Sequence, residues 1–317
     1  MIKESCRSLD VNEEYLEALR TKSYADFFTK AQSLVNQPSS FNHGHQRFSD
    51  ILLEPGQESI ATFLESASFL SRKSDLKTLL FNYFNISAEA FEICSHLLRS
   101  INQLQSNYKI VKQVLDTIDD YSHEQLGYIV SKLREQIMLK NPLSDLNRQD
   151  FIQIHGKYSL VLQHLKSKQK KIARKVKLIK CLNEASRVRV TTAFLNLNFV
   201  NINFMKCGFL RKVGDQLDVA AKGTYILNRD FDTMSILVTR LHDEVEHNKA
   251  IIQFFLDRKE DKYSLQILKE FKKNDFGFRK QAEELEEHLY LCLVSINRAR
   301  ALVVKEIAKS CKGNPDQ

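Results

Sequence analysis

The 317-residue sequence contains few of the residues that make turns: nine glycines and four prolines. No proline occurs between residues 143 and 314. Folds made of strands and tight turns need such residues every ten or so positions. Their scarcity argues against a β-rich fold. It predicts an all-α protein, an elongated bundle of long antiparallel helices with coiled-coil-like heptad seams.

Sequence motifs of the common enzyme classes are also missing. No nucleophile elbow, P-loop or dinucleotide-binding glycine loop occurs. His242 and His247 are five positions apart, so on a helix they point about 140° apart and do not share one metal ion. His43 and His45 lie in a stretch rich in proline and serine, with no third ligand nearby. We therefore expect no enzymatic activity, catalytic residue, metal, cofactor or small-molecule substrate.

The six cysteines are widely spaced, and no C-x-x-C pair occurs among them. The first fifteen residues, MIKESCRSLDVNEEY, are charged and lack the apolar core of a secretory signal. Both features predict a reduced protein that faces the cytosol, with thiols that are mostly buried rather than paired in disulfides.

Two segments carry apolar residues at alternating spacings of four and three, from Ala90 to Ile118 and from Leu285 to Val303. This spacing buries one face of a helix against a partner helix. Ser87 and Asp230 are expected to cap the N-termini of helices, and Pro142 to end one. The expected helix-interface residues are Cys94, Leu97, Ile101, Leu104, Leu285, Leu289 and Ile296.

The positions of helix-breaking residues and the local composition predict five consecutive regions. They are an N-terminal helix with a linker containing proline, serine and histidine (1–58), a helical half ending in a basic helix (59–186), an uncharged connector or membrane-proximal segment containing asparagine (187–222), a C-terminal helical half (223–311) and a tail (312–317).

The stretch KSKQKKIARKVKLIK, residues 166–180, has eight basic residues and no acidic one. It could be a solvated helix face, a lipid contact or a nucleic-acid contact. Anionic lipid attracts each such residue by about 1 kcal/mol. Nucleic acid is disfavoured because no aromatic side chain is present for base stacking. The uncharged segment ten residues later favours lipid. The predicted lipid-binding residues are Lys166, Lys168, Lys170, Lys171, Arg174, Lys175, Lys177 and Lys180.

Residues Val190 to Met205 carry no charge but include four asparagines. Sixteen residues fall short of the roughly 20 that span a bilayer. A helix would place the asparagines on opposite faces, and a strand would need one slip in its alternation. We expect a connector packed on the bundle or a segment at a membrane surface. The predicted membrane-proximal residues are Phe194, Leu195, Leu197, Phe199, Val200, Ile202 and Phe204.

Three stretches resemble a plant family: VNEEYLEALRTKSY (11–24), LLFNYFNISAEAFEICSHLLRSINQLQSNY (79–108) and GTYILNRDFDTMSILVTRLHDEVEHNKA (223–250). The family is uncharacterised protein family 0496, also called domain of unknown function 677, and includes the integrin-like and bypass-like proteins. The resemblance implies an all-helical plant protein, often membrane-associated, without an established biochemical activity. Relatives usually have a longer apolar segment, rich in alanine and valine, in place of residues 190–205.

The features together predict a non-enzymatic helical protein that acts through protein or lipid contacts at the cytoplasmic face of a membrane, by resemblance the plasma membrane. Its expected partners are an anionic membrane surface and a helical protein, rather than nucleic acid. The alternative is a soluble scaffold or regulator, cytoplasmic or nuclear, whose basic stretch binds nucleic acid or an import receptor.

Overall fold

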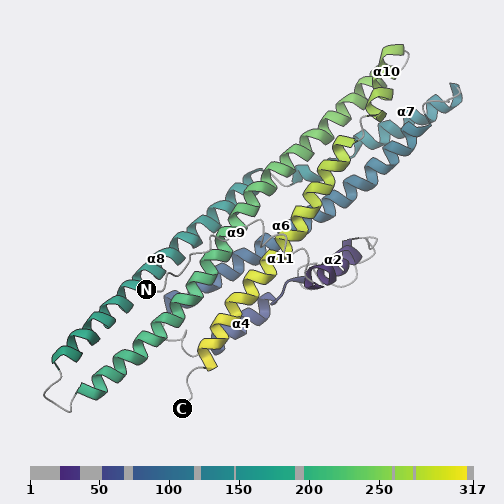
Figure 1. Cartoon of the computed structure of the whole chain (residues 1–317). Helices are drawn as coiled ribbons and strands as arrows, with labels where there is room; N and C mark the ends of the chain where they lie inside the picture. The colour runs from purple at the N-terminus through teal and green to yellow at the C-terminus, as the bar shows by residue number, and fades with distance from the viewer. Residues whose placement is uncertain are drawn as a thin grey trace. The chain divides into compact units, whose positions relative to one another are not determined.

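A computed structural model of the chain describes residues 22–35, 52–67, 74–117, 123–145, 148–189, 196–258, 261–273 and 276–312. Every regular element in these ranges is a helix, so the predicted all-α class is confirmed (Figure 1). The elements are α2 (Lys22–Val35), α4 (Gln57–Ser66), α6 (Ser74–Asp116), α7 (His123–Met138), the 3₁₀ helix η1 (Pro142–Asp145), α8 (Arg148–Arg189), α9 (Asn196–Asp257), α10 (Lys262–Lys273) and α11 (Phe276–Lys312).

Four helices are long because nothing in their sequences interrupts them: α6 has 43 residues, α8 42, α9 62 and α11 37. None of these four contains proline, which would remove a backbone donor and clash with the preceding turn. Pro142 lies just beyond α7 and begins η1, where the first residue needs no hydrogen-bonded N–H. The prediction that this proline ends a helix is confirmed.

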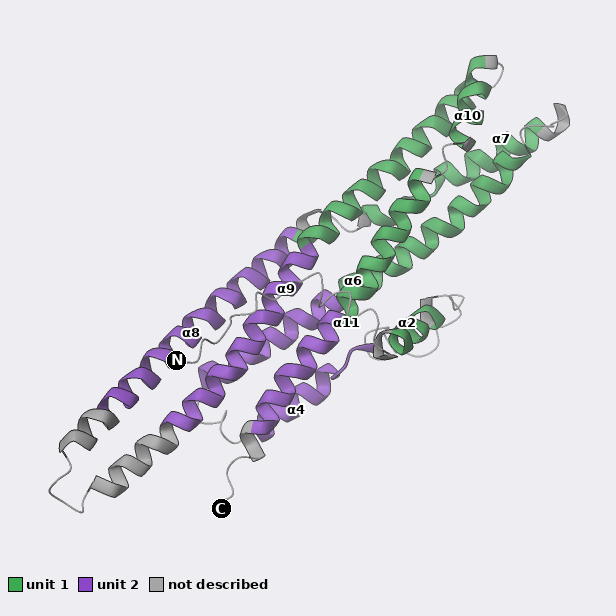
Figure 2. Cartoon of the chain, viewed as in Figure 1, with its two compact units in different colours: residues 1–48, 92–151, 232–294 green, residues 49–91, 152–231, 295–317 purple. Residues whose placement is uncertain are grey.

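Contacts divide the chain into two compact units, coloured separately in Figure 2. Unit 1 consists of residues 1–48, 92–151 and 232–294, and unit 2 of residues 49–91, 152–231 and 295–317. Each unit is therefore assembled from three separate stretches of the chain, and α6, α8, α9 and α11 contribute residues to both.

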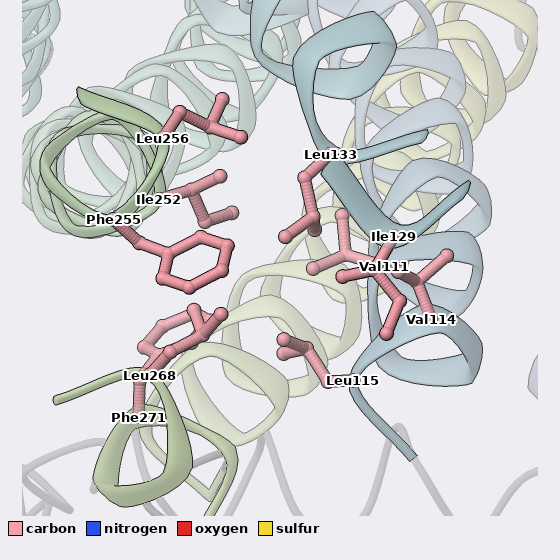
Figure 3. Close-up of a cluster of buried hydrophobic side chains, with 10 residues drawn as sticks. All are labelled: Val111, Val114, Leu115, Ile129, Leu133, Ile252, Phe255, Leu256, Leu268 and Phe271. Atoms are coloured by element: carbon pink, nitrogen blue, oxygen red, sulfur yellow. The ribbon is translucent and has the colours of Figure 1, made fainter. Parts of the chain in front are cut away.

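The core of unit 1 contains a cluster to which four helices contribute, shown in Figure 3. Phe255 on α9 and Leu268 on α10 are fully buried and point toward the side chains of α6 and α7. Burying a side chain of this size contributes about 1.5–3 kcal/mol. The cluster comprises Val111, Val114, Leu115, Ile129, Leu133, Ile252, Phe255, Leu256, Leu268 and Phe271.

In unit 2, α6 and α8 run antiparallel. Lys157 Nζ donates to Glu89 Oε1 and Lys168 Nζ donates to Asp75 Oδ2, so residue numbers rise along one helix as they fall along the other. In unit 1, α6 and α11 also run antiparallel. The Tyr108 ring stacks on the Phe278 ring, and Gln105 Nε2 donates a hydrogen bond to Glu286 Oε2.

The interior of unit 2 contains a buried cation, Arg300 on α11. Its guanidinium donates to the carbonyl oxygens of Pro55 and Phe84, at 2.7 and 2.8 Å, and to Ser87 Oγ at 2.7 Å. Burial lowers the pKa of Arg300 to about 10, and at neutral pH the side chain still carries its charge. These hydrogen bonds attach the segment that precedes α4 to both α6 and α11.

Two predicted helix caps are wrong. Ser87 lies inside α6, where its hydroxyl donates to the Phe84 carbonyl, and Asp230 lies inside α9. Both residues precede an apolar repeat, which is where a helix N-terminus was expected. In each case the helix begins many residues earlier, at Ser74 for α6 and at Asn196 for α9. Burial raises the pKa of the Asp230 carboxyl to about 7, as expected for a group within a packed helix rather than at an exposed cap. The predicted interface residues Cys94, Leu97, Ile101, Leu104, Leu285, Leu289 and Ile296 are all buried.

The uncharged segment joins α9 rather than a strand, because this helix begins at Asn196. The strand alternative is therefore wrong for residues 196–205. Phe194 and Leu195 lie outside the described residues, as do the side chains of Leu197, Phe199, Val200, Ile202 and Phe204. Across the described ranges, no helix combines the length and the hydrophobicity needed to cross a membrane.

Candidate functional site

The basic stretch forms the second half of α8 and presents its side chains in two directions. At 100° per residue, Lys168, Lys171 and Lys175 share one side of the helix. Lys166, Lys170, Arg174 and Lys177 share the opposite side, called here the outer face. Of the eight basic residues, only Lys168 is half-buried; the others are exposed.

Few of these basic side chains are neutralised by the protein itself. Lys168 Nζ lies 2.8 Å from Asp75 Oδ2 at the start of α6. Lys166 Nζ lies 5.9 Å from the centre of the Tyr225 ring on α9, an attraction that leaves its charge in place. Among the residues that the structure describes, no other basic residue of the stretch forms an ion pair. The outer face therefore keeps its positive charge.

The inner lysines line a groove of about 400 Å³ within unit 2, called here the basic groove. The start of α6 and one face of α9 form the rest of its wall. Volumes of about 300–1,000 Å³ are typical of ligand pockets. The lining residues are Ser74, Asp75, Leu76, Lys168, Lys171, Ile172, Lys175, Leu210, Val213 and Leu217.

The groove combines charge on one side with an apolar floor. Leu76, Val213 and Leu217 in its lining are buried. Hydrogen bonding and charge from Lys168 lower the pKa of the Asp75 carboxyl, with a smaller contribution from the charge of Lys171. Asp75 therefore stays ionised at neutral pH and offsets one of the three lysine charges.

Two exposed leucines lie beyond the groove on α8: Leu178 is 62% exposed and Leu182 is 56% exposed. Lys171, Lys175, Leu178 and Leu182 follow one another at spacings of four, three and four, which places them along one side of the helix. Cationic and apolar side chains thus continue each other along the same surface.

The sequence indicated the basic residues as a binding surface, but it did not indicate that three of them line a groove. Of the lining residues, the sequence indicated Lys168, Lys171 and Lys175, while Asp75, Leu210 and Leu217 were missed. These three residues come from parts of the chain far from α8, and periodicity indicates which face of a helix is apolar but not which helix covers it. Leu178 and Leu182 could have been found, because both continue the spacing of Lys171 and Lys175.

Of the two histidines considered as a metal site, His242 makes other contacts in unit 1, and His247 is exposed. His242 Nδ1 lies 3.3 Å from Asp243 Oδ1, and Nε2 lies 3.4 Å from Ser144 Oγ. Within the ranges given above, no group of three or more His, Cys, Asp or Glu residues is placed to hold a metal ion. His43 and His45 lie outside those ranges.

Comparisons with known proteins identify the family. Residues 18–209 match the family described as "Protein of unknown function (DUF677)". The chain is 31% identical to UPF0496 protein At1g20180 of Arabidopsis thaliana, over 96% of this chain and 93% of that protein. It is 26% identical to putative UPF0496 protein 2 of Oryza sativa subsp. japonica, over 95% and 91%. No solved structure matches the chain. The chain therefore belongs to the UPF0496 family of plant proteins, whose function is not known.

Proposed function

We propose that the protein is a non-enzymatic helical protein that binds the anionic cytoplasmic surface of a membrane through the second half of α8. The observation that supports this proposal most directly is the charge of that segment. Seven of the eight basic side chains between Lys166 and Lys180 are exposed, and of these eight only Lys168 forms an ion pair with another described residue.

The energy of such a contact follows from the number of charges. Each lysine or arginine near an anionic leaflet contributes about 1 kcal/mol. The four residues of the outer face would thus contribute about 4 kcal/mol at low salt. Unpaired basic residues suit this role because no internal ion pair has to break before they meet lipid.

Vesicle sedimentation tests the proposal by replacing Lys166, Lys170, Arg174 and Lys177 with glutamine. Binding to phosphatidylserine vesicles should fall by at least about tenfold, because four contacts of about 1 kcal/mol are lost. None of these residues lines the basic groove, and all four are exposed, so the fold should be retained.

A matched control removes four exposed positive charges elsewhere, by replacing Lys109, Arg134, Arg298 and Lys305 with glutamine. This variant has the same net charge as the outer-face variant, yet it should bind within about threefold of the unmodified protein. Equal losses in the two variants would show that net charge alone governs binding. Unchanged binding in the outer-face variant would refute the proposal. If the unmodified protein stays in the supernatant after the vesicles sediment, the result favours a soluble scaffold.

A further inference from the structure

The basic groove differs from the outer face in being concave and partly apolar. Its lining places three lysines and Asp75 around a space of about 400 Å³, and Lys168 pairs with that aspartate at 2.8 Å. Lys171 and Lys175 are exposed and form no ion pair within the described part of the chain. The groove therefore carries a formal excess of two positive charges.

Two charges match the phosphomonoester group. A phosphomonoester carries about 1.5–2 negative charges at neutral pH and three acceptor oxygens, whereas a phosphodiester carries one negative charge. Lys171 and Lys175 are one turn apart, about 6 Å along the helix axis, so both flexible side chains can reach one phosphate. Lysine binds phosphate as a point charge on a flexible stem.

The other walls of the groove indicate that the phosphate is carried by a lipid. Five of the ten lining residues are apolar, and none is aromatic, so the groove has no surface on which a nucleotide base could stack. The exposed Leu178 and Leu182 continue the line of Lys171 and Lys175. A molecule with a phosphate at one end and acyl chains at the other would satisfy both parts of this surface.

We infer that the basic groove binds the phosphomonoester headgroup of an anionic lipid, with Lys171 and Lys175 contacting the phosphate and Leu178 and Leu182 lying against the acyl chains. Lys168 acts as a positioning residue, because its bond to Asp75 holds the start of α6 against α8. This inference rests on the proposed membrane contact and adds selectivity to it. The outer face supplies general attraction, and the groove selects one headgroup.

The experiment compares phosphatidylcholine vesicles that contain either phosphatidic acid, a phosphomonoester lipid, or phosphatidylserine, adjusted to the same zeta potential. The unmodified protein should bind the phosphatidic acid vesicles about tenfold more tightly, since only their headgroup fits the excess charge of the groove. A double replacement, Lys171→Gln with Lys175→Gln, should reduce this preference to less than about twofold.

The matched control is Lys170→Gln with Lys177→Gln, which removes the same charge from the opposite side of the same helix. This variant should bind both kinds of vesicle more weakly but keep the preference for phosphatidic acid. Circular dichroism of both variants should match that of the unmodified protein, because the four side chains are exposed.

The possible failures are distinguishable. Equal binding of the unmodified protein to both vesicles, or an unchanged preference in the groove variant, would overturn the inference and leave the general membrane contact standing. Absence of binding to either kind of vesicle would overturn both. Glycerol 3-phosphate at about 10 mM should not abolish the preference, since it lacks acyl chains; if it does, the ligand is a soluble phosphate and the lipid assignment is wrong.

Discussion

At the scale of single residues, Arg300 shows how unit 2 holds an irregular piece of chain. Its guanidinium has hydrogen bonds to backbone carbonyls and to the side chains of Ser87 and Gln57, and none of these acceptors is a carboxylate. Asn297, one turn earlier on α11, donates to the Leu52 carbonyl and accepts from the Glu54 N–H. These two side chains join residues 52–57 to α11 through polar contacts.

Replacing Arg300 with methionine should destabilise the protein by about 3 kcal/mol, because buried carbonyl oxygens would lose their donor. Replacing it with lysine should cost less, about 2 kcal/mol, because one ammonium group cannot reach Pro55, Phe84 and Gln57 together. Urea denaturation followed by circular dichroism measures both changes.

The control for Arg300 is Arg298→Met, an exposed arginine two positions earlier on the same helix. It should change the free energy of unfolding by less than about 0.5 kcal/mol. If Arg300→Met is as mild as the control, the network of hydrogen bonds around the guanidinium does not stabilise unit 2.

Residue-scale predictions from the sequence failed where a residue type has two common roles. Ser87 and Asp230 are both typical helix caps, and each precedes an apolar repeat, yet both lie within longer helices. The bond from Arg300 to Ser87 connects residues more than 200 positions apart, and local spacing contains no information on it. Buried polar contacts of this kind depend on the tertiary fold.

At the scale of helices, α9 and α11 pack closely at Gly223. A Cβ atom built at this glycine would lie 3.0 Å from Ala299 Cβ and 3.2 Å from Tyr83 Oη, both of them closer than ordinary van der Waals contact. Tyr83 is fully buried, and burial raises the pKa of its hydroxyl. Three helices therefore meet at a point where an added methyl group would be tightly packed.

Gly223→Ala should lower the free energy of unfolding by about 1–2 kcal/mol. Overpacking destabilises a protein by about 1–3 kcal/mol, whereas the better helix propensity of alanine stabilises it by at most about 1 kcal/mol. Gly156→Ala on α8 is the matched control, since a Cβ there would meet no atom within 4 Å. This control should stabilise the protein, and thermal unfolding of the two variants should shift in opposite directions. A rise for both would show that α9 and α11 can move apart at no cost.

Helix existence was largely predictable, while helix length and partners were not. Cys94, Leu97, Ile101 and Leu104 follow a clear heptad spacing and are buried as that spacing indicates. The sequence pattern does not separate α10 from the helix that follows it, because Lys262–Lys273 spans only twelve residues. Its Leu268 and Phe271 join the cluster in Figure 3, a contact that requires the chain to turn back after α9.

At the scale of the whole molecule, neither unit is a continuous piece of sequence. Unit 2 takes residues from three stretches, and the basic groove combines Asp75 from α6, Lys171 from α8 and Val213 from α9. Composition along the chain could locate the basic stretch, but it could not show that an apolar wall from α9 would lie beside it. The groove is a property of the fold.

The charge of the whole chain depends on a single segment, and this makes membrane binding sensitive to salt. The sequence has 47 basic and 39 acidic residues, and residues 166–180 hold eight of the basic ones and no acidic one. The remaining residues are therefore balanced, with 39 basic and 39 acidic side chains. Attraction to an anionic surface should come from this one segment, with little contribution from the rest of the chain.

Raising NaCl from about 0.1 M to 1 M shortens the screening length from about 10 Å to about 3 Å. Binding to phosphatidylserine vesicles should consequently fall by at least about tenfold, because the exposed lysines and Arg174 in the second half of α8 are screened from the lipid charges. Sucrose at equal osmolality is the control and should leave binding unchanged. Protein that stays on the vesicles at 1 M NaCl and leaves only with detergent would contradict the electrostatic contact, and would assign the attachment to apolar side chains instead.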